Sequence, residues 1–274
     1  MLLCGKAGIG KSRLAATILE RLVGEPHVRM RYFCSPQHTD SALCPIIAHM
    51  TRAARFARND DAKTKLDKLD ALLATPATSR EDAALLAELL SLPNDGRYPA
   101  LELSSQQRRQ KTLEALIGQI DASARKSPVL MIFEDADWAD PSSLEVLGRL
   151  VDQIDAMSAL LFVTFRPEFA PSWLGRSHVT SRTITRLAPL EGMALIDQVA
   201  GDKPLATNIR NDMVERADGI PLFVEEMTKA VLLKTCMRPL TTSRTLTVRL
   251  APPRLGGGIS GSTSAHSWFV RSLG

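Results

Sequence analysis

The 274-residue sequence lacks acidic side chains near its C-terminal end: none follows Glu226, although seven lysines and arginines do. Residues 236–274 are rich in Thr, Ser, Arg, Gly and Pro. A segment of this composition buries too little apolar surface to form a packed core. It is either a flexible linker or a frameshifted tail from a gene of high GC content, and the mixture favours the second. We therefore expect 236–274 to be a disordered or frameshift-like tail.

Other features are also missing. No run of 18 apolar residues exists, so we expect neither a transmembrane helix nor a membrane partner. A motif begins at residue 5 and leaves no room for a signal peptide. The cysteines show no metal-binding spacing and are typical of reduced thiols. Together these absences predict a cytoplasmic protein. The cysteines are Cys4, Cys34, Cys44 and Cys236.

The net charge of +4 could suggest a nucleic-acid partner, but the excess lies largely after Glu226. No basic helix is interleaved with aromatic residues, so we do not expect nucleic acid to bind. Arg108, Arg109 and Lys111 share one predicted helix. They form either a solvated basic face or, alternatively, include an arginine that bridges subunits.

The most informative segment is GKAGIGKS at residues 5–12, which matches G-x-x-x-x-G-K-[ST] at every fixed position. Its glycines allow a tight turn whose backbone N–H groups point at phosphate oxygens. Lys11 would place its ammonium on the β- and γ-phosphates, and the Ser12 hydroxyl would bind Mg²⁺. A turn without function is the alternative.

The surroundings of this loop favour a nucleotide site. Residues 1–4 are apolar, as the end of a buried strand should be, and a helix is predicted to follow with Leu14, Ile18 and Leu22 on one stripe. This arrangement aims a helix N-terminus at an anion. Because almost nothing precedes the loop, we expect the first strand to be truncated. The predicted nucleotide-binding residues are Gly5, Gly8, Ile9, Gly10, Lys11, Ser12, Arg13 and, in a helical lid, Pro221.

Strands and helices alternate along the rest of the chain, which indicates an α/β fold with a parallel sheet. Ser104 and Gln107 have the spacing of a capping box at the start of one helix. We expect a core at 1–186 with a helical insertion at about 45–103, and a helical lid at 187–235. Strands are predicted at 27–34, 128–133 and 159–165, and helices at about 45–57, 60–73, 80–92, 104–120, 142–153 and 222–233.

Two strand ends carry further candidate residues. Glu134 and Asp135 follow a buried strand; the first would hold Mg²⁺ and the second would polarise the attacking water. Two acids leaving a strand for solvent are the alternative. Arg166 follows the next strand, so it should emerge at the same edge and reach a γ-phosphate. It could instead be a surface arginine before Pro167.

Five segments in order resemble the ATPase module of the signal-transduction ATPases with numerous domains (STAND), a branch of the AAA+ superfamily. They are GKAGIGKSRL, RYFCSPQHTDSALCPII, VLMIFEDADWADPSSLEVL, LLFVTFRPEF and DGIPLFVEEM, and they span residues 2–235. The chain is most similar to the central region of bacterial adenylate/guanylate cyclase-like regulators, where a cyclase domain precedes the ATPase and tetratricopeptide repeats follow. The resemblance implies a three-layer P-loop NTPase fold followed by a partial helical lid, with ATP and Mg²⁺ as ligands.

The same resemblance implies roles for individual residues. It places Lys11 and Ser12 in the phosphate loop, Glu134 and Asp135 in the acid pair, and Arg166 at a sensor position. Gly219 and Pro221 fall on a lid motif. Glu134 stands where many relatives have Asp, and no cyclase domain is present, so cyclase activity is not expected.

Three functions remain open on this evidence. The first is a regulatory ATPase switch that hydrolyses ATP slowly and acts through other domains or proteins of a signalling regulator. The second is an autonomous AAA+ motor or loader, which would need an arginine finger from a neighbouring subunit; the sequence shows no clear finger. The third is a truncated, inactive remnant, because an incomplete central strand weakens the sheet.

Overall fold

The structure of the protein, a computed structural model, describes residues 1–74, 78–94 and 96–236. The tail expected at 236–274 lies outside the described residues from position 237 onward. Within the described part, no helix is both long and apolar enough to cross a membrane.

The core elements follow the alternation of strands and helices that the sequence predicts. They are β1 (Leu2–Cys4), α1 (Lys11–Arg21), β2 (Val28–Phe33), η1 (Pro36–His38), α2 (Cys44–Ala53), α3 (Ala62–Leu72), α4 (Arg80–Leu89), α5 (Ser105–Ala124), β3 (Val129–Glu134), η2 (Ala136–Trp138), α6 (Pro141–Gln153), η3 (Ile154–Ala156), β4 (Ala159–Phe165) and β5 (Ser181–Thr183). Three helices come last: α7 (Pro189–Ala200), α8 (Thr207–Ala217) and α9 (Pro221–Cys236).

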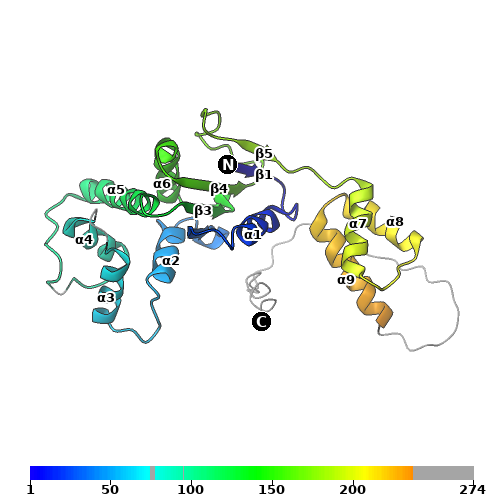
Figure 1. Cartoon of the computed structure of the whole chain (residues 1–274), viewed down its shortest axis with the longest axis horizontal. Coiled ribbons are helices and arrows are strands. Elements are labelled where there is room, and N and C mark those ends of the chain that lie inside the picture. The colour runs from blue at the N-terminus through cyan, green and yellow to red at the C-terminus, as the bar shows by residue number, and fades with distance from the viewer. Residues whose placement is uncertain (75–77, 95, 237–274) are drawn as a thin grey trace.

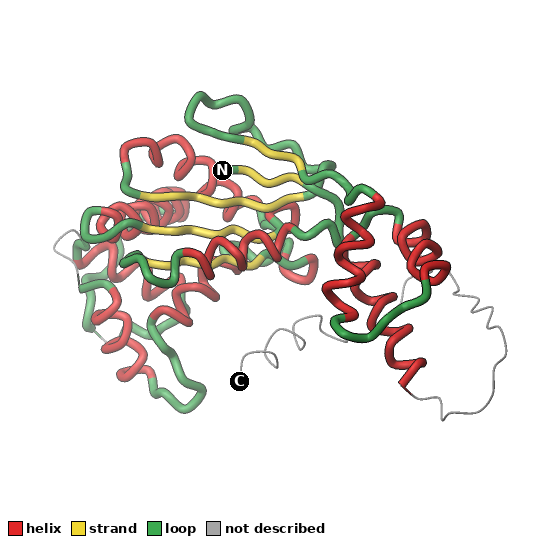
Figure 2. The backbone as a smooth tube through the Cα atoms, turned by 45° about the vertical axis from the view of Figure 1, so that its right-hand side comes forward, coloured by secondary structure: helices red, strands yellow, loops and turns green. Residues whose placement is uncertain are grey.

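The five strands form one parallel sheet in the order β2-β3-β4-β1-β5, seen as the yellow layer in Figure 2. Every residue of β3 is buried, as a strand covered on both faces requires. Strand β4 lies between β1 and β3. The segments that follow these three parallel strands therefore emerge side by side at the same edge of the sheet. This order brings together segments that are more than a hundred residues apart in the sequence.

Helices cover both faces of the sheet, which confirms the predicted three-layer α/β fold of the P-loop NTPase type (Figure 1). On one face, α1 packs against Leu3, Leu130, Ile132 and Phe162. On the other face, a larger cluster joins the sheet to α2, α5 and α6, and extends to α3 and α4. Residue alternation along β3 sends successive side chains to these two cores.

The helices α7, α8 and α9 have a small core of their own, made by Ile196, Met213, Ala217, Val224 and Val231. In Figure 1 they lie to one side of the sheet, beyond the loop end of β1. Their role as a lid stays a prediction, which the contacts described below support.

Several local details differ from the sequence-based expectations, among them the ends of α2 at Ala53 and of α4 at Leu89, which come before the expected residues 57 and 92. Leu14 is 43% exposed, because the buried face of α1 is formed by Ala15 with Ile18, Leu19 and Leu22. Strand β5 was not expected, since its residues are exposed and have no apolar pattern. Helix α5 runs to Ala124 rather than Ile120. The capping box is confirmed: Ser104 and Gln107 exchange side-chain and backbone hydrogen bonds.

Candidate nucleotide site

The loop that joins β1 to α1 is built around glycines. Gly8 has a φ of 75°, a left-handed value that favours glycine, and a Cβ there would lie 3.1 Å from Ile220. Gly10 is the N-cap of α1 and offers no side chain to that helix end. The first turn of α1 contains no acidic residue. Its backbone N–H groups therefore face the loop without a capping side chain, which suits an anion.

Lys11 lies at the start of α1 and is only 7% exposed. Its ammonium donates hydrogen bonds to two loop carbonyls, Gly5 at 2.9 Å and Lys6 at 3.3 Å. The nearly buried Lys11 ammonium is thus hydrogen-bonded only to neutral carbonyl oxygens of the loop. A bound phosphate would supply the negative charge that these carbonyls lack. Ser12, the next residue, is exposed at the same helix end, where its hydroxyl is available to a metal.

Glu134 and Asp135 have different surroundings although they are neighbours. Glu134 ends β3, is 5% exposed, and accepts a hydrogen bond from Arg31 of β2 in an ion pair. Asp135 has a left-handed φ of 53°, and its N–H donates to the Thr164 hydroxyl at 3.0 Å. This bend turns the chain away from the strand directly after Glu134.

Burial raises the pKa of Asp135, and the charges of Asp137 and Glu134 add to this effect. Lys11 and Arg166 act in the opposite direction. The Asp135 carboxyl therefore lies within electrostatic reach of both predicted phosphate-binding cations. A carboxyl with a raised pKa is better suited to accept a proton, or to orient water, than a fully solvated aspartate.

Arg166 follows β4 and is held by the loop after the acids. Its N–H donates to Asp137 at 3.2 Å, and its Nε lies 3.4 Å from the other oxygen of that carboxylate. The guanidinium carbon lies 5.1 Å from the centre of the Trp138 ring, a cation–π distance. Its Nε is buried without a hydrogen bond. Arg166 is therefore held at this edge of the sheet, while its Nε still lacks a hydrogen-bond acceptor.

The start of α9 contacts the phosphate loop directly. The Leu222 N–H donates to the Gly8 carbonyl at 3.2 Å. Pro221 is the first residue of α9, where its missing N–H costs nothing. Gly219, two residues before Pro221, has a φ of 68°, and a Cβ there would lie 2.6 Å from the Leu187 carbonyl oxygen. Only glycine fits at position 219. The turn that it allows brings the start of α9, with Pro221, beside the phosphate loop.

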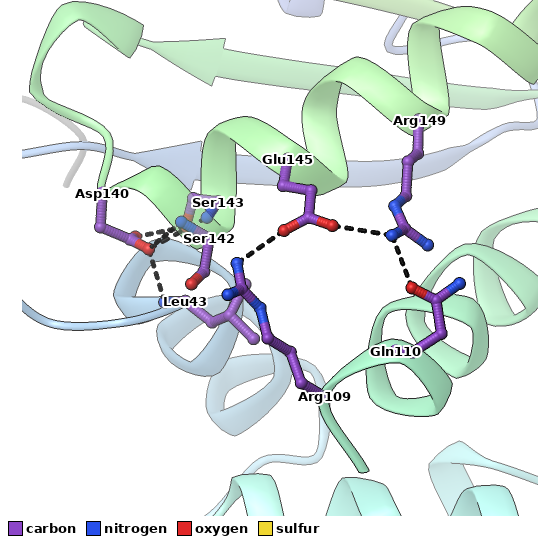
Figure 3. A network of polar contacts seen from close by, with 8 residues as sticks. All are labelled: Leu43, Arg109, Gln110, Asp140, Ser142, Ser143, Glu145 and Arg149. Carbon is purple, nitrogen blue, oxygen red and sulfur yellow. Dashed lines mark hydrogen bonds and ion pairs between the residues drawn. The ribbon is translucent and has the colours of Figure 1, made fainter. Parts of the chain in front are cut away.

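Asp140 has a structural role in the same region, shown in Figure 3. It is 2% exposed and caps α6 by accepting the N–H groups of Ser142 and Ser143, each at 3.0 Å. The same oxygen accepts the Leu43 N–H at 3.0 Å, and the second accepts the Ser143 hydroxyl at 2.5 Å. Asp140 therefore joins the segment before α2 to the start of α6.

The three basic residues of α5 are engaged within the chain. Arg108 pairs with Glu88, Arg109 with Glu145 and Lys111 with Glu81, each at 2.6 Å. Figure 3 shows Glu145 between Arg109 and Arg149, which also reaches Gln110. These contacts favour the reading of a solvated, ion-paired face.

The donor set fits a magnesium nucleotide. Among the residues that the structure describes, no group of three or more His, Cys, Asp or Glu side chains could hold a metal by itself. Mg²⁺ is usually bound by few protein ligands together with phosphate oxygens, and Ser12 with one acid would provide such a set.

Comparison with known proteins gives the family. The model of the AAA ATPase domain matches residues 1–163. The chain belongs to the AAA ATPase domain family. An uncharacterized protein of Rhizobium meliloti (strain 1021) is 28% identical over 240 residues, which are 83% of this chain and 22% of that protein. The chain therefore spans about a fifth of the length of this curated relative.

Two solved structures are similar in outline. One is a STAND protein with a tetratricopeptide repeat sensor from Pyrococcus horikoshii, with a TM-score of 0.42 and 14% identity, covering 90% of this chain and 28% of that one. The other is Cdc6p from Pyrobaculum aerophilum, with a TM-score of 0.45 and 12% identity, covering 84% and 53%.

The sequence did not point to three residues of the candidate site: Arg31, Thr164 and Asp137. An arginine in the middle of β2 is unusual for a strand next to a buried one, and this was the available signal for Arg31. Thr164 and Asp137 gave none, because their partners depend on which strands are neighbours.

Proposed function

We propose that this chain is an ATP-binding regulatory switch of a bacterial signal-transduction ATPase, which hydrolyses ATP slowly. The observation that carries the proposal is that β1, β4 and β3 are parallel neighbours, so that Lys11, Arg166 and Asp135, which follow them, lie at one sheet edge. The phosphate loop at this edge contacts α9 through Leu222. Nucleotide at this loop would thus lie against both the sheet and the three final helices.

The proposed roles follow from the geometry and charge of each side chain. Lys11 and the N-terminal N–H groups of α1 bind the phosphates, and Ser12 and Glu134 hold Mg²⁺. When bound, Mg²⁺ would supply charge neutralisation for the phosphates. Asp135 orients the attacking water, Arg166 senses the γ-phosphate, and Pro221 packs near the base. These assignments are part of the proposal.

Arg31 adds a requirement to this scheme. The Glu134 carboxylate is already paired with Arg31, so it can hold a metal only by exchanging or sharing that partner. The exchange would make metal binding dependent on the position of β2. A module that must first release an ion pair suits slow turnover better than rapid cycling.

The contact between Leu222 and Gly8 supports a switch rather than a plain ATPase. Phosphate binding would reorganise the Gly8 peptide, whose carbonyl accepts the Leu222 N–H. The helices α7–α9 would then be held or released according to the nucleotide state. We propose that attached domains of a cyclase-like regulator receive this change, as the resemblance implies.

The test uses the full chain and a fluorescent ATP analogue, with hydrolysis and light scattering measured in parallel. We expect Mg²⁺-dependent binding, turnover below the roughly 1–1000 per second of typical enzymes, and a monomeric mass. Lys11→Ala should abolish binding. Lys6→Ala is the matched control, because Lys6 lies in the same loop at a variable position and should retain binding.

Three results would decide against parts of the proposal. Binding that survives in Lys11→Ala would disprove the phosphate-loop assignment. Fast turnover with the mass of a hexamer would favour a motor over a switch. Absence of binding, together with a circular dichroism spectrum that lacks fixed tertiary signals, would indicate an inactive remnant.

A further inference from the structure

A cavity of about 100 Å³ lies on the sheet face opposite α1, between the strands β2 and β3 and the helices α2, α3, α5 and α6. Its walls are mostly apolar and include Met50, Leu116, Ile120, Phe133 and Leu147. The phosphate loop does not contribute to it. It is therefore separate from the candidate nucleotide site.

One wall of this cavity carries a hydroxyl with a poor partner. Tyr32 is 4% exposed, and its hydroxyl donates to the sulfur of Met30 at 3.5 Å. Buried tyrosines usually find a nitrogen or oxygen partner, and a thioether sulfur is only a weak acceptor. A ligand oxygen in the cavity would give Tyr32 a stronger hydrogen bond than the protein provides.

The wall also carries the polar side chains of Gln119, Ser123 and His49, and the His49 ring is uncharged. The His49 ring centre lies 4.8 Å from that of Tyr32, and a hydrogen bond joins His49 to the backbone of Arg31. Burial lowers the pKa of His49 to about 4, and the charge of Arg52 adds to this. His49 is therefore neutral near pH 7, and no ionised wall residue is present to compensate a charged ligand.

The volume limits the ligand further. A dry apolar cavity of about 150 Å³ in another protein holds one benzene molecule. This cavity, at about 100 Å³, is smaller, so a molecule of a single ring would fit only by extending into the open side of the cavity. Ala53 lines it at an exposed position, which gives the cavity a mouth at the end of α2. Since Tyr32 and Arg31 are consecutive in β2, the cavity lies directly behind the ion pair between Arg31 and Glu134.

We propose that this cavity is a binding site for a small, neutral, mostly apolar molecule that directs one hydrogen-bonding group at Tyr32. The site does not depend on the proposed nucleotide switch, and its test contains no nucleotide. Phenol is the probe, because it combines one ring with one hydroxyl; benzene, which lacks the hydroxyl, is the comparison.

The experiment is calorimetric titration of the full chain with each probe. We expect the native chain to bind both. Tyr32→Phe keeps the ring and removes the hydroxyl, so it should weaken phenol binding about three- to tenfold, the effect of one hydrogen bond, and leave benzene binding unchanged. Ala53→Phe should weaken both by more than about tenfold by closing the mouth. Ala71→Phe, at an exposed position on α3 outside the cavity, is the matched control.

The proposal is overturned if phenol gives no binding up to its solubility limit. It is also overturned if Ala53→Phe and Ala71→Phe bind the probes equally, because the probes would then bind elsewhere. Equal phenol affinity in Tyr32→Phe would show that the hydroxyl does not meet the ligand. Tyr32→Phe keeps nearly the same side-chain volume, so the variant should fold. Circular dichroism verifies the folding independently of the binding measurement.

Discussion

Replacement of Asp140 by alanine should destabilise the core more than most single changes. One carboxylate oxygen accepts three backbone N–H groups, those of Leu43, Ser142 and Ser143. The first belongs to the segment before α2, and the other two to the first turn of α6. The change therefore affects two parts of the fold that no other side chain in Figure 3 connects.

The size of the loss follows from these contacts. Removal of an N-cap side chain costs about 1 kcal/mol. The Leu43 N–H is left buried without a partner, because Leu43 is only 7% exposed, and this adds about 1–3 kcal/mol. We therefore expect a loss of about 2–4 kcal/mol in the free energy of unfolding. For a chain of this length the midpoint of thermal unfolding should fall by roughly 5–10 °C.

The assay is urea unfolding of the full chain, followed by circular dichroism. Asp152→Ala is the control on the same helix, because Asp152 makes only an exposed ion pair with Arg176 and should change stability by less than about 0.5 kcal/mol. Asp140→Asn keeps an acceptor oxygen and should lose less than Asp140→Ala. If Asp140→Ala and Asp152→Ala unfold at the same urea concentration, the assigned capping role is wrong.

Two further predictions concern the ion pair between Arg31 and Glu134 and the buried ring of His49. Arg31→Met leaves Glu134 buried without its cation. Because a third of the Arg31 side chain is exposed, the loss in urea unfolding should lie somewhat below the roughly 3–5 kcal/mol of a fully buried pair, whereas the exposed Arg29→Met should cost little. Restoration of stability by a second change, Glu134→Gln, would identify the uncompensated carboxylate as the cause, and its failure would refute this. The lowered pKa of His49, about 4, means that the unfolded chain binds a proton more readily between about pH 6.5 and 4. The stability of the native chain should therefore fall across that range by about 2–3 kcal/mol more than that of His49→Asn, and parallel pH profiles would contradict the assignment.

Local patterns determined a large part of this protein. The phosphate loop, the capping box at Ser104 and the all-buried strand β3 each depend on residues close together in the chain, so spacing and residue type were enough to predict them. The edge from which Asp135 and Arg166 emerge could also be predicted, because parallel strands share one direction. The weakly patterned β5 could not be, since its three exposed residues are held by pairing with β1.

The pairing of distant side chains was decided by the tertiary structure alone. Strand order places Thr164 against Asp135, and Arg31 against Glu134, over separations that no local pattern records. Asp140 joins α6 to Leu43 for the same reason, and the Leu222 contact with Gly8 depends on how α9 returns to the loop. The sequence by itself thus determined which chemical groups the candidate site contains. Only the packed sheet decided what holds those groups in the protein, because hydrogen bonds and ion pairs depend on distance in space.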